Sequence, residues 1–327
     1  MSEGEYVARA EGAVGPAVDQ KERPVPPPPE AAIAPPGNAL RKRAAKIGAL
    51  LVSPACVLVG MFVVFPLGFA VYISLTDWPL IGPYRYVGLE NYRSLFSDPE
   101  FVHAVEFTFE YTAIVTPPIF LVGYGLALLL RSNRFGAKIF RTLFFLPFVV
   151  GLTIESFMFA IELQPGSGWV DWLLSKIGVA SSTQAWTVSH DRALLAISVI
   201  VVWFAAGLTM LILTAGMQGI PKELYEAAEV DGASWWRKEL KVTLPLLRRS
   251  IALSLIISVI GSFLAFNQFF ILAQNNVSLE TVVEWVYQTG FSSYHLGYAT
   301  SMALFLVVVI GLVSMGQFLL LRDTTEL

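Results

Sequence analysis

Long uninterrupted stretches of apolar residues constrain this sequence more than any other feature. A run of about 20 apolar residues is needed to cross roughly 30 Å of hydrocarbon at 1.5 Å per helical residue. Six stretches of sufficient length occur, at 47–75, 108–130, 140–163, 193–217, 251–273 and 299–321. The sequence therefore predicts six transmembrane helices.

The chemistry of the bilayer narrows the fold class further. A lipid interior offers no water to backbone N–H and C=O groups, so a spanning segment is either a helix or a strand of a closed barrel. Barrel strands alternate apolar and polar residues, whereas these stretches are solidly apolar. Only 14% of the residues are charged, against about a quarter in soluble domains. We therefore expect an all-α integral membrane protein.

The first 40 residues differ in composition from the rest of the chain. Seven prolines between positions 24 and 36 interrupt any helix, and the remaining small and charged residues supply no apolar core. We interpret 1–40 as a disordered, proline-rich cytoplasmic tail. The transmembrane domain is then expected at 41–327.

Lysine and arginine are distributed unevenly among the connecting segments. Cytoplasmic loops of membrane proteins carry most of the positive charge. Fifteen lysines and arginines lie just before the first predicted span, between spans two and three, between spans four and five, and after the last span. The other three connections hold four, namely Arg85, Arg93, Lys176 and Arg192. We therefore expect a multi-pass protein of the plasma membrane with both termini in the cytoplasm.

One predicted cytoplasmic loop, at about 218–245, carries its own signals for helix starts and stops. Pro221 suits the first position of a helix, and the glutamates that follow favour its positive N-terminal end. Gly232 can adopt the left-handed conformation that ends a helix. A second short helix is expected from Ser234, as its cap, to Leu240. The loop is thus predicted to hold two short helices.

The first of these short helices presents small apolar side chains beside acidic ones, from Leu224 to Ala233. An amphipathic helix of this kind can lie in a groove on another protein. It can equally rest on lipid headgroups. The residues alone leave both interpretations open.

The spacing of residues in this loop resembles a known family motif. Glu226, Ala227 and Ala228 are followed by Gly232, then by nine residues, and then by a Val-Thr-Leu-Pro sequence that ends at Pro245. This arrangement is similar to the Glu-Ala-Ala loop of binding-protein-dependent permeases of ATP-binding-cassette importers. Further similarity to the sugar permease branch lies at 88–92, 140–147 and 297–300, so the resemblance covers the chain from about residue 41 onward.

The resemblance implies a set of partners and a role for the loop. In that family the loop forms coupling helices that sit in a cleft on the ATP-hydrolysing subunit, so Glu226, Ala227, Ala228, Gly232 and Pro245 are expected to couple this chain to an ATPase dimer. A second permease subunit, an external solute-binding protein and membrane lipid are the other expected partners. The fold implied is a permease core with cytoplasmic coupling helices.

The chain itself is not expected to be an enzyme. It contains no Gly-x-x-x-x-Gly-Lys-Ser/Thr motif, so it lacks the loop that cradles nucleotide phosphates. We therefore expect no cofactor in this chain, with ATP and magnesium bound by the partner ATPase. The three histidines do not have the spacing of metal ligands, and nothing in the sequence argues for a nucleic-acid partner.

Polar residues inside the predicted spans are candidates for a solute pathway, because such residues are costly in lipid and usually face a pathway or another helix. Ser258 and Ser262 share one helix face, which Ala265 and Phe269 would continue; small-residue helix packing explains the serines equally well. The other candidates are Asn267 and Gln268, which can also lie at the external boundary, and Trp203, which can be an interfacial anchor. The carboxylate Glu155 is the last candidate.

Two other classes of function remain open. A permease of the same superfamily can carry a polyamine, a phosphate or an amino acid, although a charged solute should require more charged lining than Glu155. A secondary transporter is the less favoured alternative, because the six spans show no evident repeat of halves. Phe107, Leu264 and Ala265 depart from the sugar branch near the expected path, which weakens the inference about the substrate rather than about coupling.

Overall fold

The computed structural model describes residues 38–79, 81–131, 136–176, 178, 186, 189–273 and 277–321. The predicted tail at 1–40 lies outside the described residues except for its last three. Contacts divide the chain into two units, 1–59 and 60–327. In the first, the described part is the helix α1 (Asn38–Val59), which contains Pro54.

The second unit begins with a helical stretch made of η1 (Gly60–Val64) and α2 (Phe65–Ser74). A hairpin of β1 (Thr76–Asp77) and β2 (Arg85–Tyr86) follows, with Thr76 opposite Tyr86. The short helix α3 (Glu90–Leu95) braces the hairpin, because the Asn91 amide donates to the carbonyl oxygens of Ser74 and Thr76 at 2.8 and 2.9 Å.

The longest helix, α4 (Pro99–Leu130), begins nine residues before the predicted start of the second span. Its start is set by Asp98, whose carboxylate accepts from the backbone N–H groups of Glu100 and Phe101. Such a cap satisfies backbone donors that have no partner within the helix. The first turns of α4 contain charged residues, so the length of the apolar run did not predict them.

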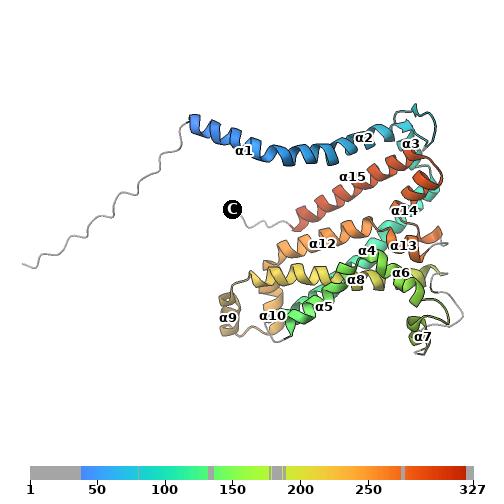
Figure 1. The fold of residues 1–327 in the computed structure, drawn as a ribbon. Helices are drawn as coiled ribbons and strands as arrows, with labels where there is room; N and C mark the ends of the chain where they lie inside the picture. Colours follow the sequence, from blue (N-terminus) through green and yellow to red (C-terminus); the bar gives the residue numbers. More distant parts are fainter. Residues whose placement is uncertain are drawn as a thin grey trace, which may run out of the picture. The chain divides into compact units, whose positions relative to one another are not determined.

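The core of the second unit is the packing of α4 against α8 (His190–Gln218) (Figure 1). Two more helices, α5 (Ala137–Val150) and α12 (Arg248–Phe263), also contact α8. Glycines permit the close approach of these helices. A Cβ atom at Gly123 of α4 would lie 2.6 Å from Cγ2 of Thr209, and one at Gly207 of α8 would lie 2.1 Å from the carbonyl oxygen of Phe144. Small residues play this role where helices pack in lipid.

The third predicted span, at 140–163, is two helices rather than one. The chain forms α5 (Ala137–Val150) and α6 (Leu152–Glu162), which meet at an angle of 89°. The bend is at Gly151, whose φ of +94° is favourable only for glycine. The helix α7 (Trp169–Lys176) follows, and its Asp171 accepts hydrogen bonds from Gly166 N–H and the Trp186 indole.

The fifth predicted span, at 251–273, is also interrupted. It comprises α12 (Arg248–Phe263) and α13 (Asn267–Leu272) with a non-helical step between them. The Thr281 hydroxyl donates to the carbonyl oxygen of Ala265 at 2.6 Å. This bond satisfies a backbone group that the break leaves unpaired, which is a requirement inside a membrane.

The chain ends with a cluster of short helices and one long span. These are η3 (Val277–Leu279), α14 (Val282–Tyr287), η4 (Gln288–Ser292) and α15 (Leu296–Leu321). The start of α15 packs directly against the hairpin. A Cβ atom at Gly297 would lie 1.9 Å from the carbonyl oxygen of Thr76, so only glycine allows this approach.

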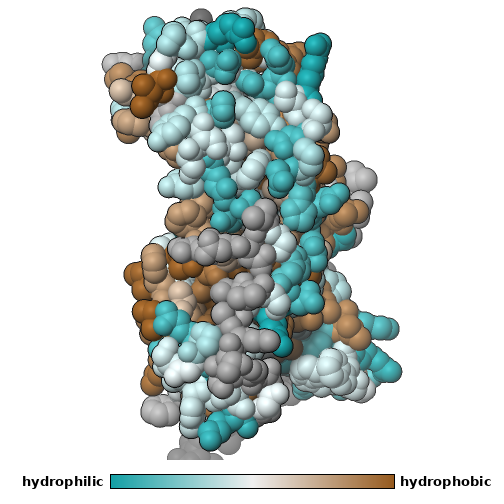
Figure 2. All heavy atoms as spheres, turned by 90° about the vertical axis from the view of Figure 1, so that its right-hand side faces the viewer, coloured by the Kyte–Doolittle hydropathy of each residue, from teal (hydrophilic) through white to brown (hydrophobic). Residues whose placement is uncertain are grey.

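The described residues contain four helices long and apolar enough to span a membrane, or up to six if each of two bent pairs counts as one span. The unbent spans are Lys46–Ser74, Pro99–Leu130, His190–Gln218 and Leu296–Leu321. The bent pairs are Ala137–Val150 with Leu152–Glu162, and Trp235–Leu246 with Arg248–Phe263. Each of the six predicted apolar stretches is mostly helical, and the third and fifth are interrupted. Figure 2 shows a face on which hydrophilic residues predominate, with hydrophobic residues gathered mainly at its margins.

Candidate coupling segment and solute cleft

The loop predicted at about 218–245 does hold two short helices. Residues 219–246, from the end of α8 to the bend before α12, are called the coupling segment below. Its first helix is α9 (Lys222–Val230). Pro221 precedes this helix as its cap, with ψ of 136°, so its expected place as the first helical residue is wrong by one position. Leu224 is 43% exposed and Val230 is 89% exposed, which leaves apolar surface beside the exposed Glu226.

The end of α9 is fixed by backbone hydrogen bonds. Gly232 has a φ of +69°, as predicted for a left-handed helix stop. The N–H of Ala233 donates to the carbonyl oxygen of Ala228 at 2.9 Å, and that of Gly232 donates to Glu229 at 3.0 Å. This pair of bonds is the Schellman motif, which satisfies the last carbonyls of a helix and turns the chain.

The second helix of the segment is longer than expected. α10 (Trp235–Lys238) follows Ser234 and continues through η2 (Glu239–Thr243) into α11 (Leu244–Leu246). Pro245 lies in the first turn of α11, directly after the wide turn of η2. The chain then bends by 72° into α12.

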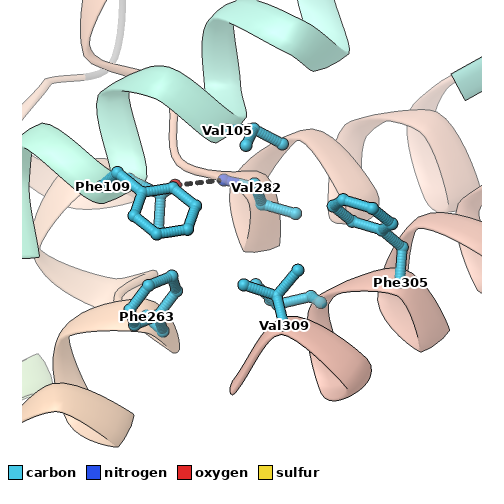
Figure 3. Close-up of a pocket in the computed structure, with 8 residues that line it drawn as sticks. Val105, Phe109, Phe263, Val282, Phe305 and Val309 are labelled. Carbon is cyan, nitrogen blue, oxygen red and sulfur yellow. Dashed lines mark hydrogen bonds between the residues drawn. The ribbon is translucent and has the colours of Figure 1, made fainter. Parts of the chain in front are cut away.

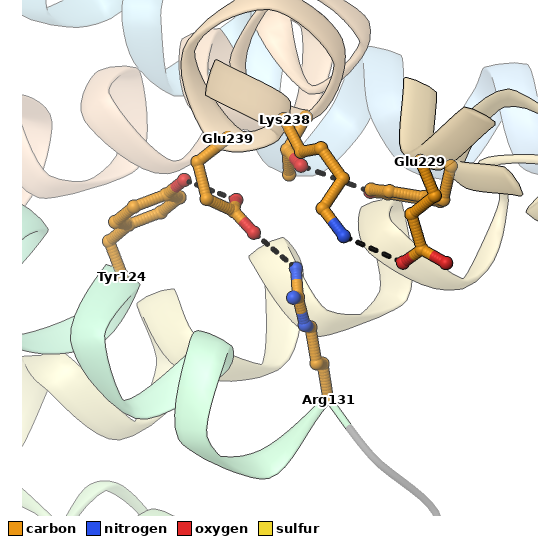
Figure 4. A network of polar contacts seen from close by, with 7 residues as sticks. Tyr124, Arg131, Glu229, Lys238 and Glu239 are labelled. Atoms are coloured by element: carbon orange, nitrogen blue, oxygen red, sulfur yellow. Dashed lines mark hydrogen bonds and ion pairs between the residues drawn. The ribbon is translucent and has the colours of Figure 1, made fainter. Parts of the chain in front are cut away.

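Two carboxylates of the coupling segment form ion pairs, one within the segment and one that connects it to α4 (Figure 4). The Lys238 ammonium lies 2.7 Å from Glu229 and joins the two short helices. Its hydrogen bond and positive charge lower the pKa of Glu229. Glu239 pairs with Arg131 and accepts a hydrogen bond of 3.2 Å from the Tyr124 hydroxyl, so it connects the segment to the end of α4.

A cleft of about 130 Å³ lies between α4, α5, α6, α8, α12 and α13. Its polar lining comes from side chains without formal charge: Thr209, Ser254, Ser258, Ser262 and Gln268. Two aromatic rings, those of Phe148 and Phe204, also line it and lie 5.1 Å apart. The cleft thus offers hydroxyl and amide groups beside flat apolar faces.

Gln268 is the most informative polar group in the cleft. Its side chain is 2% exposed, and its amide nitrogen donates to the Tyr111 hydroxyl at 3.2 Å. The amide oxygen has no hydrogen-bond partner among the described residues. Because a buried polar atom is costly without a partner, a hydrogen-bond donor brought to this oxygen would be stabilising.

The structure brings together only part of the predicted pathway. Ser258 and Ser262 line the cleft, and the Ser262 hydroxyl donates to the Ser258 carbonyl at 2.9 Å. Trp203, Asn267 and Glu155 are not among the lining residues. Trp203 is 45% exposed and meets Phe159 edge to face. Glu155 is 2% exposed, and neither carboxylate oxygen has a partner among the described residues.

The expected continuation of the serine face through Ala265 and Phe269 is wrong, because the helix breaks before both positions. Phe269 packs instead in the core, 4.8 Å from Tyr111 and 5.3 Å from Phe107, in edge-to-face contacts. The sequence also held a signal that was missed. Ser254 precedes Ser258 by four residues and extends the same face by one turn.

A second, apolar pocket lies between α4, α12, α14 and α15 (Figure 3). Its volume is only about 10 Å³, and its lining includes Phe109, Phe263 and Phe305. A void of this size barely accommodates one water molecule. It is a packing defect of the core and offers no room for a solute.

Comparison with known proteins agrees with this architecture. Residues 119–324 match the family model described as the inner membrane component of binding-protein-dependent transport systems. The chain is 32% identical over 264 residues to the arabinooligosaccharides transport system permease protein AraP of Bacillus subtilis, covering 78% of this chain and 82% of AraP. It is 31% identical over 261 residues to the sulfoquinovosyl glycerol transport system permease protein SmoG of Agrobacterium fabrum, covering 79% and 84%.

A solved structure shows the same fold. One chain of a bacterial ABC transporter involved in the import of the acidic polysaccharide alginate superposes with a TM-score of 0.75 at 22% identity, covering 88% of this chain and 99% of that one. The family match over most of this chain, its apolar helices and its loop motif agree with this shared fold. The chain belongs to the family of inner membrane components of binding-protein-dependent transport systems, the permeases of ABC transporters.

Proposed function

We propose that this chain is a permease subunit of an ATP-driven importer that carries a neutral sugar or oligosaccharide into the cytoplasm. The observation that carries the proposal is the cleft, whose polar lining consists of three serines, a threonine and a glutamine beside two aromatic rings. Sugars bind through hydroxyl groups and apolar ring faces, and such a lining meets both needs. The names of AraP and SmoG, which both refer to sugar compounds, support the same class of solute.

In this proposal the coupling segment docks on a separate ATPase dimer, which binds ATP and magnesium. Glu226 supplies a charge for a basic group of the partner, Ala227 and Ala228 permit close approach, Gly232 shapes the turn, and Pro245 leads into α11. The exposed apolar surface of α9 supports docking on a protein groove. A second permease and an external solute-binding protein complete the transporter, which lies in the plasma membrane with both termini of this chain in the cytoplasm.

Ser258, Ser262 and Gln268 form the centre of the solute path in this proposal, since they line one cleft. Trp203, Asn267 and Glu155 remain proposed members of a wider path, to which the proposed second permease would contribute further lining. Glu155 is the strongest of these three, given its two carboxylate oxygens without a partner among the described residues.

Substitution of Ser262 tests whether solute passes through the cleft. Ser262→Leu should abolish uptake, because the larger side chain fills a space of about 130 Å³. Ser262→Ala should reduce uptake by less than about tenfold, since one neutral hydrogen bond contributes only about 1 kcal/mol net. Uptake is measured in cells with a panel of labelled neutral oligosaccharides.

A matched control separates blockage from failed assembly. Ser53→Leu makes the same change at an exposed position of α1 and should leave uptake unchanged. The recovery of intact complex is measured for all three variants by size-exclusion chromatography. Normal uptake by Ser262→Leu would refute the path, and loss of complex in that variant would favour helix packing as the role of Ser262.

A further inference from the structure

We propose that the Arg131–Glu239 pair, with Tyr124, is the joint through which movement of the coupling segment reaches α4 and the cleft. This inference rests on the proposed function, because it assumes that an ATPase moves the segment. Arg131, Glu239 and Tyr124 are positioning residues here, since none of them lines the cleft.

The geometry attaches one carboxylate to α4 at two points (Figure 4). Arg131 follows the last residue of α4, and its guanidinium lies 2.5 Å from one oxygen of Glu239. The other oxygen accepts from the hydroxyl of Tyr124, seven residues earlier on α4, at 3.2 Å. Residues seven apart share a helix face, so the carboxylate is held along two turns of α4 and resists both sliding and rotation.

Burial makes the loss of either partner more costly here than in an exposed ion pair. The Glu239 side chain is 4% exposed and that of Arg131 is 33% exposed. Removing one partner of such a pair leaves a buried charge without compensation, which is far more costly than the loss of an exposed pair. The other ion pair of the segment, Lys238–Glu229, has a carboxylate that is 64% exposed, and exposed pairs contribute little.

The end of α4 is also tied to α5. The guanidinium of Arg141 donates from two of its nitrogens to the carbonyl oxygen of Leu130, the last residue of α4. Displacement of Glu239 therefore acts on a point where the coupling segment, α4 and α5 meet. On α4 the distance from this point to Ile119, which lines the cleft, is twelve residues, or about 18 Å of rigid helix at 1.5 Å per residue.

A cysteine reporter in the cleft tests the joint without requiring a known solute. Cys56 is the only cysteine of the chain, so Cys56→Ala with Ser258→Cys creates a single reporter. The transporter complex is purified with its ATPase. The rate at which a water-soluble methanethiosulfonate labels the reporter cysteine is then measured twice, once without nucleotide and once with ATP. With the joint intact, the two rates should differ several-fold.

Variants of the joint then show whether it carries the change. Glu239→Gln and Arg131→Ala should each reduce the ATP-dependent difference in labelling rate by at least threefold, while Arg131→Lys, which keeps the charge, should retain most of it. The exchanged pair Arg131→Glu with Glu239→Arg should recover at least half of the difference. Recovery of complex and basal ATP hydrolysis, measured in parallel, should stay within twofold of the reporter protein.

The outcomes distinguish this inference from the proposed function. No effect of ATP on labelling in the reporter protein with the joint intact would contradict the proposed function itself. If ATP changes the labelling rate in the reporter protein and changes it equally in Glu239→Gln and Arg131→Ala, the inference about the joint is overturned and the proposed function is not. Loss of the effect in the single variants without recovery in the exchanged pair would assign the pair to local folding and would also overturn the joint.

Discussion

The packing of α5 against α8 leads to a prediction about Gly207. A Cβ atom at this position would lie 2.1 Å from the carbonyl oxygen of Phe144, 2.9 Å from the carbonyl carbon and 3.0 Å from the Cα of Phe145. All three are backbone atoms, so no rotation of a side chain can relieve the contact. Gly207→Ala must therefore push α5 away from α8.

The expected cost follows from the size of this clash. Overpacking a close-packed interior costs typically about 1–3 kcal/mol, and the gain in helix propensity from glycine to alanine recovers at most about 1 kcal/mol. Each kcal/mol corresponds to roughly 2–4 °C in Tm for a chain of a few hundred residues. We expect Gly207→Ala to lower Tm by several degrees, and to weaken uptake because Phe148 and Phe204 of these two helices line the cleft.

The assay is thermal unfolding of the purified protein in detergent, followed by size-exclusion chromatography. Gly125→Ala on α4 is the matched control, since a Cβ atom there meets nothing within 4 Å. Its Tm should equal or exceed that of the unmutated protein. A Tm for Gly207→Ala at or above that of Gly125→Ala would refute the argument from close packing.

Two further predictions concern the coupling segment and a buried carboxylate. Gly232→Pro and Glu226→Lys should uncouple solute transport from ATP hydrolysis without preventing insertion, because proline cannot adopt a φ of +69° and lysine reverses the charge of the proposed docking surface. Stimulation of ATP hydrolysis by solute at the unmutated level in both variants would contradict this assignment. In α14, outside the candidate spans, burial and then the neighbouring charge of Glu280 raise the pKa of Glu284 to about 7. The folded protein then binds a proton that the unfolded chain releases above about pH 4.5, so stability falls as pH rises from about 4.5 to 7. Glu284→Gln should raise Tm at pH 8 but hardly at pH 5, and an equal effect at both values would be evidence against the shifted pKa.

The sequence predicted the helices well but not their interruptions. Each apolar stretch forms mostly helix, because a segment in lipid must satisfy its own backbone hydrogen bonds. Length and composition are therefore enough to predict helix there. The breaks at Gly151 and before Asn267 lie inside apolar runs, where hydropathy carries no signal. The second break is stabilised by Thr281, 16 residues beyond Ala265, and a bond over that separation is set by tertiary structure.

The features of the candidate sites that form through local contacts were predictable, and those that form through distant contacts were not. The stop of α9 at Gly232 was predictable, since all its hydrogen bonds lie within 227–233. The attachment of Glu239 to Arg131 joins residues 108 apart in sequence, and no local pattern indicates it. Gln268 was open to interpretation as a boundary residue, and only the fold shows that it faces the cleft.

The way in which α9 ends has a consequence for how this surface can change during evolution. The hydrogen bonds that end the helix join backbone atoms of 227–233. Gly232 is the one residue in that stretch with a positive φ, a conformation that favours glycine. Leu224, Glu226 and Val230 point outward and take no part in them. Mutations at these three positions can therefore follow changes in the proposed ATPase partner while the turn persists. Partner recognition could then diverge between related transporters without a new fold for the segment.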